Sequence, residues 1–267
     1  MRVIREVRSG SVLEKEIFTV PDGSHLTKRT EPKEEPVKTA EERVEINRRK
    51  SERLFIRKIN SSFTSHSWYV TLTYRDFDLP LSYGEAERCL ENFLRRLKRW
   101  APGVRYIAVT GYGKQSNRLH HHLIIDGNGI DGEKLLELWT AGDVKRAERL
   151  RRNNYYDGKN CGEDFTGLAV YLHAHSNAKT KGKRWKESRN VAKPFKDTPR
   201  PLKRELSVEK PPKAPKGYRF VGVYVSDFHG QYISFKYVKI QNEQAEIRPF
   251  SNDLKVCPFN DHERREE

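Results

Sequence analysis

The sequence has little of what membrane-anchored or disulfide-stabilised proteins require. No apolar run approaches the roughly 18 residues that a membrane-spanning helix needs. Densely spaced charges in the first eight residues exclude an apolar signal core at this end of the chain. The three cysteines, Cys89, Cys161 and Cys257, form an odd and widely spaced set that fits neither a disulfide framework nor a zinc ribbon. We therefore expect a reducing, cytoplasmic setting and no membrane partner.

Hydrophobic residues are also scarce, at 35% of the chain, against 33% charged residues. Some of the length is therefore expected to form solvated arms and loops rather than core. Lys and Arg number 52 against 37 acidic residues, which gives a net charge of +15. Such a basic balance indicates an anionic polymer as partner, above all nucleic acid. A merely soluble basic protein is the alternative.

The pattern of apolar residues predicts an α+β fold with a central antiparallel sheet and flanking helices. Strands do not alternate strictly with helices, which argues against a parallel sheet. We expect, in chain order, a β-hairpin over residues 1–20, a helix over 40–60, a strand over 68–74, a helix ending near Trp100, strands over 104–110 and 118–126, short helices after Asp131 and over 164–175, and a second hairpin over 218–240.

Composition also suggests how the chain is divided. We expect an N-terminal hairpin and linker over residues 1–39, a core over 40–178 entered by a basic helix, a basic segment with the C-terminal hairpin packed on the core over 179–240, and a charged tail over 241–267. Three prolines between residues 179 and 204 argue against regular structure there.

Three consecutive histidines stand in the middle of one predicted strand, over residues 118–126. Side chains alternate between the faces of a strand, so His120 and His122 point the same way, while His121 and its apolar neighbours face the core. Two imidazoles spaced in this way can converge on one divalent metal ion. The alternative is a polar strand or surface cluster that binds no ligand.

The order of three short motifs resembles the HUH endonucleases, specifically the rolling-circle replication initiators of phages and plasmids. The first motif of that family is a Leu-Thr-Leu-Thr-like strand, here Val70-Thr71-Leu72-Thr73. The second is His-x-His, here His120-His121-His122, and the third is a tyrosine on a helix, here Tyr171. The resemblance extends from about Trp68 to Pro194.

This resemblance implies a ferredoxin-like, RRM-like nicking core with His120 and His122 as ligands of Mg or Mn. It implies that Tyr171 attacks single-stranded origin DNA, leaves a 5′-phosphotyrosine link and later rejoins the strand, with a host helicase as a further partner. The single tyrosine in the third motif is similar to the single-tyrosine type. On composition alone Tyr171 could equally be a core aromatic, because Leu168, Val170 and Leu172 surround it.

Two positions depart from the family pattern. Relatives often have a glutamate as third metal ligand where this chain has Gly111, and a lysine after the tyrosine where this chain has Ala174 and His175. These departures favour a second hypothesis, a non-catalytic DNA-binding regulator on a degenerate HUH fold. A zinc-dependent hydrolase or deaminase lacks the Glu and Cys pattern that its chemistry needs.

The basic segment after the third motif is the predicted DNA-contacting element. Cations with an interleaved aromatic residue are typical of single-strand binding, although a solvated charge run is the alternative. The candidate residues are Lys179, Lys181, Lys183, Arg184, Trp185, Lys186 and Arg189. We expect His66 at the surface, and His173 and His175 at the surface or behind the metal ligands.

Overall fold

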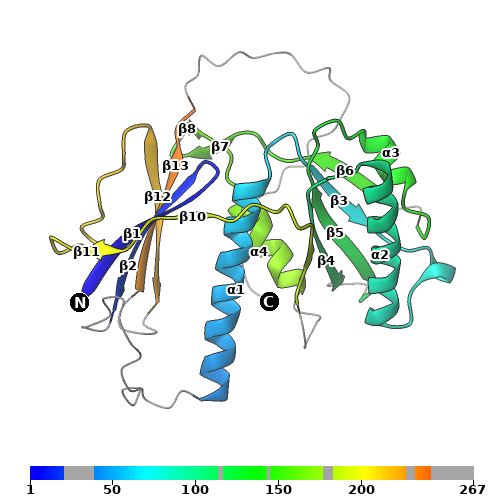
Figure 1. The fold of residues 1–267 in the computed structure, drawn as a ribbon, viewed down its shortest axis with the longest axis horizontal. Helices are drawn as coiled ribbons and strands as arrows, with labels where there is room; N and C mark the ends of the chain where they lie inside the picture. The colour runs from blue at the N-terminus through cyan, green and yellow to red at the C-terminus, as the bar shows by residue number, and fades with distance from the viewer. Residues whose placement is uncertain (21–38, 114–116, 143–144, 177–182, 227–231, 242–267) are drawn as a thin grey trace.

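The computed structural model describes residues 1–20, 39–113, 117–142, 145–176, 183–226 and 232–241. Two antiparallel sheets lie on either side of a pair of helices, and a second pair of helices covers the outer face of one sheet (Figure 1). The prediction of an α+β fold with antiparallel sheets is confirmed. The predicted linker and nearly all of the charged tail lie outside the described residues, and the division of the chain at residues 39, 178 and 240 stays a prediction.

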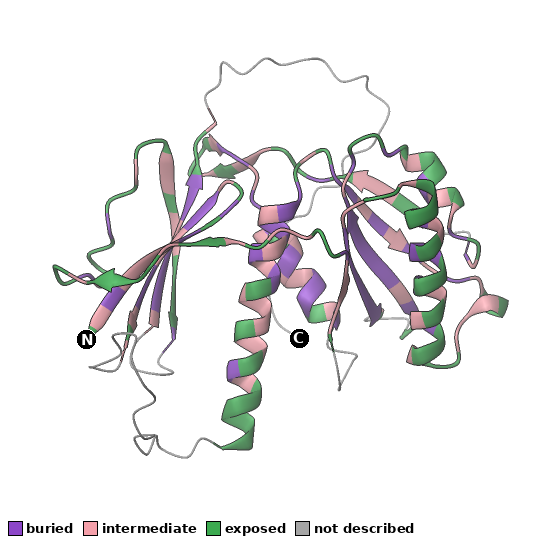
Figure 2. Ribbon diagram, viewed as in Figure 1, coloured by how far each residue is buried: buried purple, intermediate pink, exposed green. Residues whose placement is uncertain are grey.

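The sheet with the histidines has five strands in the order β6-β3-β5-β4-β9, and we call it the site sheet. Its members are β3 (Trp68–Leu72), β4 (Tyr106–Tyr112), β5 (Leu119–Ile125), β6 (Lys145–Arg149) and the short β9 (Lys186–Glu187). The two strands β4 and β5 are antiparallel neighbours, as predicted. Both faces of this sheet are covered, which explains why β4 and β5 are almost entirely buried (Figure 2).

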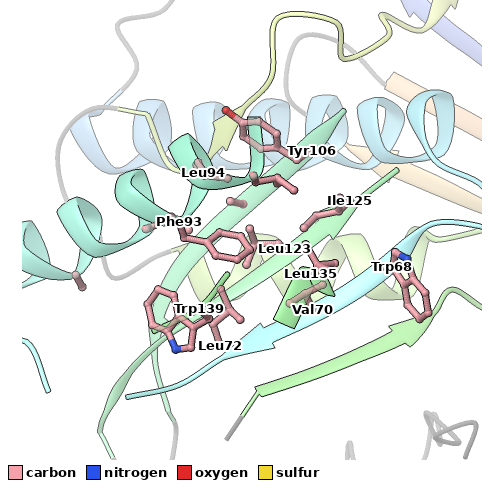
Figure 3. Close-up of a cluster of buried hydrophobic side chains, with 14 of the residues drawn as sticks. Trp68, Val70, Leu72, Phe93, Leu94, Tyr106, Leu123, Ile125, Leu135 and Trp139 are labelled. Atoms are coloured by element: carbon pink, nitrogen blue, oxygen red, sulfur yellow. The ribbon is translucent and has the colours of Figure 1, made fainter. Parts of the chain in front are cut away.

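Helices α2 (Tyr83–Trp100) and α3 (Gly132–Glu137) cover the outer face of the site sheet. Apolar side chains of α2 recur every three or four residues, so they form one stripe that packs on the sheet. The stripe and the strands bury a core that includes Val70, Leu72, Phe93, Leu123, Ile125 and Trp139 (Figure 3). The Ser82 hydroxyl caps α2 by accepting from the Glu85 amide.

Helices α1 (Ala40–Ser62) and α4 (Thr166–His175) cover the inner face of the site sheet and lie between the two sheets (Figure 1). A capping box of Thr39 and Glu42 begins α1, which satisfies backbone amides that a helix start leaves unpaired. Phe55 and Ile59 of α1 and Leu172 of α4 pack on the apolar side chains of β4 and β5. This second core holds α4 against the strand that bears the histidines.

The hairpins from the two ends of the chain together form the second sheet, which we call the terminal sheet. Its main strands are β1 (Arg2–Ser9), β2 (Val12–Thr19), β12 (Tyr218–Ser226) and β13 (Tyr232–Lys239), in the order β1-β2-β13-β12. The turn between β1 and β2 places Gly10 at φ +58° with its Cα against the Asn60 carbonyl, where a Cβ would lie 2.2 Å from the oxygen. A glycine is required there, because a side chain would push the hairpin away from α1.

Several predictions about local structure need correction. The proline-rich segment contains three two-residue strands: β9 joins the site sheet, and β10 (Phe195–Lys196) and β11 (Arg200–Pro201) pair with β1. Paired backbone, not side-chain pattern, creates these strands. The sequence pattern also missed β6 and the small β7 (Asn154–Tyr156) and β8 (Lys159–Cys161) hairpin, whose residues are mostly polar. Trp100, expected in the buried stripe, is 36% exposed at the helix end.

A search of the described helices finds none that is long and apolar enough to span a membrane.

Candidate metal and tyrosine site

The three histidines of β5 alternate between faces as predicted. His121 is fully buried on the α2 side, where its ring nitrogens contact the hydroxyls of Tyr74 (2.5 Å) and Thr110 (2.9 Å). Burial lowers the pKa of His121 to about 3, so this residue is a neutral, hydrogen-bonded part of the core. His120 and His122 instead face the helices α1 and α4, and their Nε2 atoms lie 2.9 Å apart.

The outer nitrogen of His120 fixes its protonation. Its Nδ1 lies 3.2 Å from the carbonyl oxygen of Arg118, which can only accept a hydrogen bond. Nδ1 of neutral His120 therefore carries the proton, and Nε2 presents a lone pair toward His122. This arrangement, with one ring nitrogen donating to a carbonyl and the other facing inward, is typical of metal-binding histidines.

His175 completes a group of three imidazoles. It lies at the end of α4, and one ring nitrogen each of His120, His122 and His175 fall within 4.8 Å of one another. The ring centre of His175 is 5.4 Å from that of His120 and 5.0 Å from that of His122. The expectation that His175 lies at the surface or behind the ligands is therefore wrong: it is half-buried and faces the same space as the strand pair.

Gly111 allows His175 to reach this position. Gly111 pairs with His120 across β4 and β5, and α4 ends directly above it. A Cβ at Gly111 would lie 2.7 Å from the His175 carbonyl oxygen and 3.2 Å from its Nδ1. The position where relatives often have a glutamate ligand is thus occupied by a histidine from the helix. The third ligand expected there comes from another element of the chain.

Tyr171 lies one helical turn before His175, on the same face of α4. Its ring centre is 4.4 Å from that of His175 and 5.5 Å from that of His122. Leu172 and Ala169, on another face of α4, are buried in the inner core and hold the helix in place. The structure therefore brings together the tyrosine and both histidines that the sequence predicted.

Tyr69 of β3 joins the tyrosine to the histidines. Its hydroxyl lies 2.8 Å from Nδ1 of His122, its ring stacks on that imidazole, and it is hydrogen-bonded to Tyr171. The Thr71 hydroxyl lies 3.2 Å from the same Nδ1. Sequence reasoning missed Tyr69. The alternation of β3 could have found it, because Thr71 of the first motif and Tyr69 share a face.

Burial dominates the electrostatics of the site. It lowers the pKa of His122 to about 2, aided by the neighbouring His120 and His175, so this imidazole is neutral and has a lone pair to offer. Burial also raises the pKa of Tyr171, while the hydrogen bond from Tyr69 acts in the opposite direction. The pKa of Tyr69 itself is raised, chiefly by burial.

The beginning of α4 is held from both sides. The Asn60 side chain of α1 accepts from the Phe165 amide at 2.8 Å, and Asp164 accepts from the Thr166 amide at 3.0 Å. Lys236 of the terminal sheet donates to Asp164 at 2.6 Å and to the Thr166 hydroxyl at 2.8 Å. Asp164 was expected as the N-cap; Phe165 is at that position instead, and Asp164 acts from one residue earlier.

A groove of about 1210 Å³ lies between α1, α2 and residues 183–187, at the β9 edge of the site sheet. Basic side chains outnumber acidic ones along it by seven to three. They are Arg48, Lys58, Arg95, Lys98, Lys183, Arg184 and Lys186, against Glu87, Glu91 and Glu187. The groove is therefore a positively charged surface close to the end of α4, where Trp185 packs 6.4 Å from the ring of His173.

The predicted DNA-contacting residues differ in how they are placed. Lys183 and Arg189 are exposed and Arg184 lines the groove. Lys186 is paired with Glu91 at 2.6 Å, and Trp185 is half-buried against Phe55 at 4.8 Å between ring centres. Lys179 and Lys181 lie outside the described residues.

Two further histidines lie close to the site without joining it. His173, expected at the surface or behind the ligands, is buried behind them, and its Nε2 lies 3.2 Å from the Ser51 hydroxyl of α1. His66 is half-buried in the turn before β3, and its carbonyl accepts from Arg149. Neither residue belongs to the group of three.

Residues 67–161 match the family model of Replication-associated protein ORF2. This region includes His120, His122 and Tyr69, and it ends before α4. The Replication-associated protein ORF2 of Spiroplasma virus 4 is 27% identical over 97 residues, which are 30% of this chain and 30% of that protein. The chain thus spans less than a third of that relative's length, and its similarity to replication-associated proteins covers the strand part of the site.

Among solved structures, the hypothetical protein ORF119 from Sulfolobus islandicus rod-shaped virus 1 is 14% identical, with a TM-score of 0.31. The match covers 51% of this chain and 99% of that one.

Proposed function

We propose that this protein initiates DNA replication by nicking and rejoining single-stranded origin DNA through Tyr171. The observation that supports this most strongly is the convergence of Tyr171 and three imidazoles on one face of the site sheet. The similarity of residues 67–161 to replication-associated proteins supports the biological role. The net charge of +15 and the basic groove support a DNA substrate.

In the proposed reaction the Tyr171 oxygen attacks a backbone phosphorus and the bond from phosphorus to the 3′-oxygen breaks. The 5′-phosphate becomes joined to Tyr171, and the tyrosine proton passes in net terms to the released 3′-oxygen, so charge and atoms balance. The reverse attack by a 3′-hydroxyl rejoins the strand. Because no high-energy bond is consumed, the same site performs both steps.

The donor set fits a divalent transition-metal ion. His120, His122 and His175 offer three neutral imidazoles, whereas Mg²⁺ prefers oxygen ligands. Of the two expected cations we therefore favour Mn²⁺, with water or phosphate oxygens as its other ligands. A cation there would polarise the phosphate and offset the negative charge that builds on its oxygens.

Covalent capture of DNA tests the proposal. Purified protein is incubated with single-stranded oligonucleotides and Mn²⁺, and the denatured mixture is examined by gel electrophoresis for a protein band shifted by attached DNA. We expect the band for the natural chain, its complete loss in Tyr171→Phe, and DNA affinity within about twofold of normal. Tyr155→Phe is the matched control, because that tyrosine is 67% exposed and remote from the histidines.

Two results would contradict the proposal. An adduct that persists in Tyr171→Phe would exclude Tyr171 as nucleophile. DNA binding without any adduct, over oligonucleotides that include the origin of the element encoding the protein, would favour the non-catalytic DNA-binding regulator. Replacing His120 and His122 together with Ala should remove metal dependence, and unchanged nicking would exclude their role.

A further inference from the structure

We propose that Tyr69 is a positioning residue that couples metal binding to the nucleophile, by reversing a chain of hydrogen bonds between His122 and Tyr171. The proposal rests on the proposed function for its catalytic consequence, but the coupling itself can be observed without DNA. It is based on the contacts of four side chains in the site: His120, His122, Tyr69 and Tyr171.

Without a cation, the contacts fix one direction of the chain. His120 donates through Nδ1 to the Arg118 carbonyl, so its Nε2 is a lone pair facing Nε2 of His122 at 2.9 Å. Nε2 of His122 must then carry the proton, because two lone pairs at this distance would repel. Nδ1 of His122 is left as an acceptor, and the Tyr69 hydroxyl at 2.8 Å donates to it.

With a cation on the three imidazoles, Nε2 of His122 can no longer hold a proton, because metal-binding nitrogens must present lone pairs. The proton of neutral His122 then resides on Nδ1, which becomes a donor to Tyr69. Tyr69 has one proton, and once its oxygen accepts from His122 that proton is free to be donated to Tyr171, its other partner. No net proton is gained or lost; the chain changes direction.

The consequence for Tyr171 is a hydrogen bond whose direction depends on the state of the histidines. A donor aimed at its oxygen orients the hydroxyl and stabilises negative charge as the oxygen loses its proton. Stacking of Tyr69 on His122, with ring planes 15° apart, keeps the donor in place. The nucleophile would therefore be prepared only when the metal site is filled, which limits DNA cleavage to the loaded protein.

Nuclear magnetic resonance of the full chain tests the coupling directly. The protein is labelled at tyrosine Cζ and histidine nitrogens and titrated with Zn²⁺, which is diamagnetic. We expect the His122 proton to move from Nε2 to Nδ1 and the Tyr171 Cζ signal to shift. In Tyr69→Phe the histidine signals should still respond to Zn²⁺, but the Tyr171 shift should be lost. Tyr83→Phe, which removes a half-buried hydroxyl on the opposite face of the site sheet, should behave as the natural chain.

Kinetics give the second readout. At saturating DNA and Mn²⁺, Tyr69→Phe should form the adduct about ten- to a hundredfold more slowly, the range expected for losing one hydrogen bond to a developing charge. The KM for DNA should stay within about twofold, since Tyr69 is placed behind the nucleophile. A Tyr171 shift that survives in Tyr69→Phe, or a His122 proton on Nδ1 before metal is added, would overturn the coupling. Absence of an adduct in the natural chain would instead refute the proposed function and leave the spectroscopic result standing.

Discussion

The two sheets attach to the same helix in opposite ways. Toward the site sheet, α1 presents Phe55 and Ile59, which are fully buried among apolar side chains. Toward the terminal sheet it presents Arg57, whose guanidinium pairs with Glu14 at 2.6 Å and with Glu16 of β2. The first attachment depends on apolar area and the second on charge. The chemistry is thus built on the part of the molecule that pH and salt affect least.

The terminal sheet nevertheless touches the chemistry at one point. Lys236 of β13 pairs with Asp164 immediately before α4, the helix that bears Tyr171 and His175. The ionic sheet therefore holds one end of the reactive helix, and the apolar core holds its middle. Damage to the site sheet should abolish the reaction, and damage to the terminal sheet should mainly reduce stability.

The largest expected effect comes from Gly111→Ala in the site sheet. The added Cβ would meet the His175 backbone oxygen at 2.7 Å, so α4 or β4 must shift and His175 must move away from the other histidines. A displacement of about 1 Å in such a site can cost a hundredfold in rate, and we expect at least that loss of adduct formation. Titration with Mn²⁺ should show weaker binding. Gly222→Ala in the terminal sheet, where a Cβ meets nothing within 4 Å, is the matched control. Equal rates in the two variants would refute the account of Gly111.

The next effect concerns the acid stability of the terminal sheet. Burial acts to raise the pKa of Glu16, but Arg57 and the Tyr232 hydroxyl overcome it and lower the pKa to about 2. Because the folded-state pKa lies below the unfolded value of about 4.3, the contribution of Glu16 is complete above that value. It is lost as pH falls toward 2, and it amounts to about 3 kcal/mol.

Urea unfolding at pH 7, 5, 4 and 3 measures this contribution. Glu16→Gln should lower the free energy of unfolding at pH 7 by about 3 kcal/mol, since it leaves buried Arg57 with only Glu14. It should also flatten the decline below pH 5. Glu45→Gln, which removes exposed pairs at the other end of α1, should leave both quantities unchanged. A natural chain whose stability is constant from pH 5 to 3 would show that the ion pair contributes nothing.

Much of the site sheet could be predicted from sequence because its information is local. The alternation of β5 placed His120 and His122 on one face, and adjacent strands with a short turn predicted the pairing of β4 with β5. His175 escaped because its role depends on where α4 lies over the sheet. The spacing of four residues from Tyr171, together with a glycine where a ligand was expected, was the available signal.

The terminal sheet shows the opposite limit. Its two hairpins were predicted correctly, but β2 pairs with β13 more than 200 residues later. No local pattern encodes that partner, because each hairpin alone shows only which of its residues alternate. The buried ion pairs were equally invisible, since Glu16 and Arg57 become neighbours only when the sheet docks on α1.

A smaller effect is expected where the two sheets meet, at Lys236. Replacing it with Met keeps most of the apolar stem but leaves the buried Asp164 carboxylate with fewer partners. We expect a loss of about 1–3 kcal/mol in unfolding free energy and a decrease of a few fold in adduct formation, because the start of α4 loosens. Lys239→Met, at an exposed position of the same strand, should change neither. A Lys236→Met variant with normal stability but no adduct would place Lys236 in the chemistry instead.

The smallest expected effect separates the DNA-facing surface from the merely basic one. Arg189 follows β9 and is exposed beside the site sheet, whereas Arg8 is exposed on the terminal sheet with 59% of its side chain accessible. Each contact between a cation and a single-strand phosphate changes the slope of log affinity against log salt by about 0.7. Arg189→Ala should therefore weaken oligonucleotide binding a few fold and reduce that slope by about 0.7, and Arg8→Ala should do neither. Fluorescence anisotropy at several salt concentrations measures both quantities. Equal slopes for the two variants would mean that the terminal sheet shares in DNA binding, and the division of labour between the sheets would then fail at the surface while holding in the core.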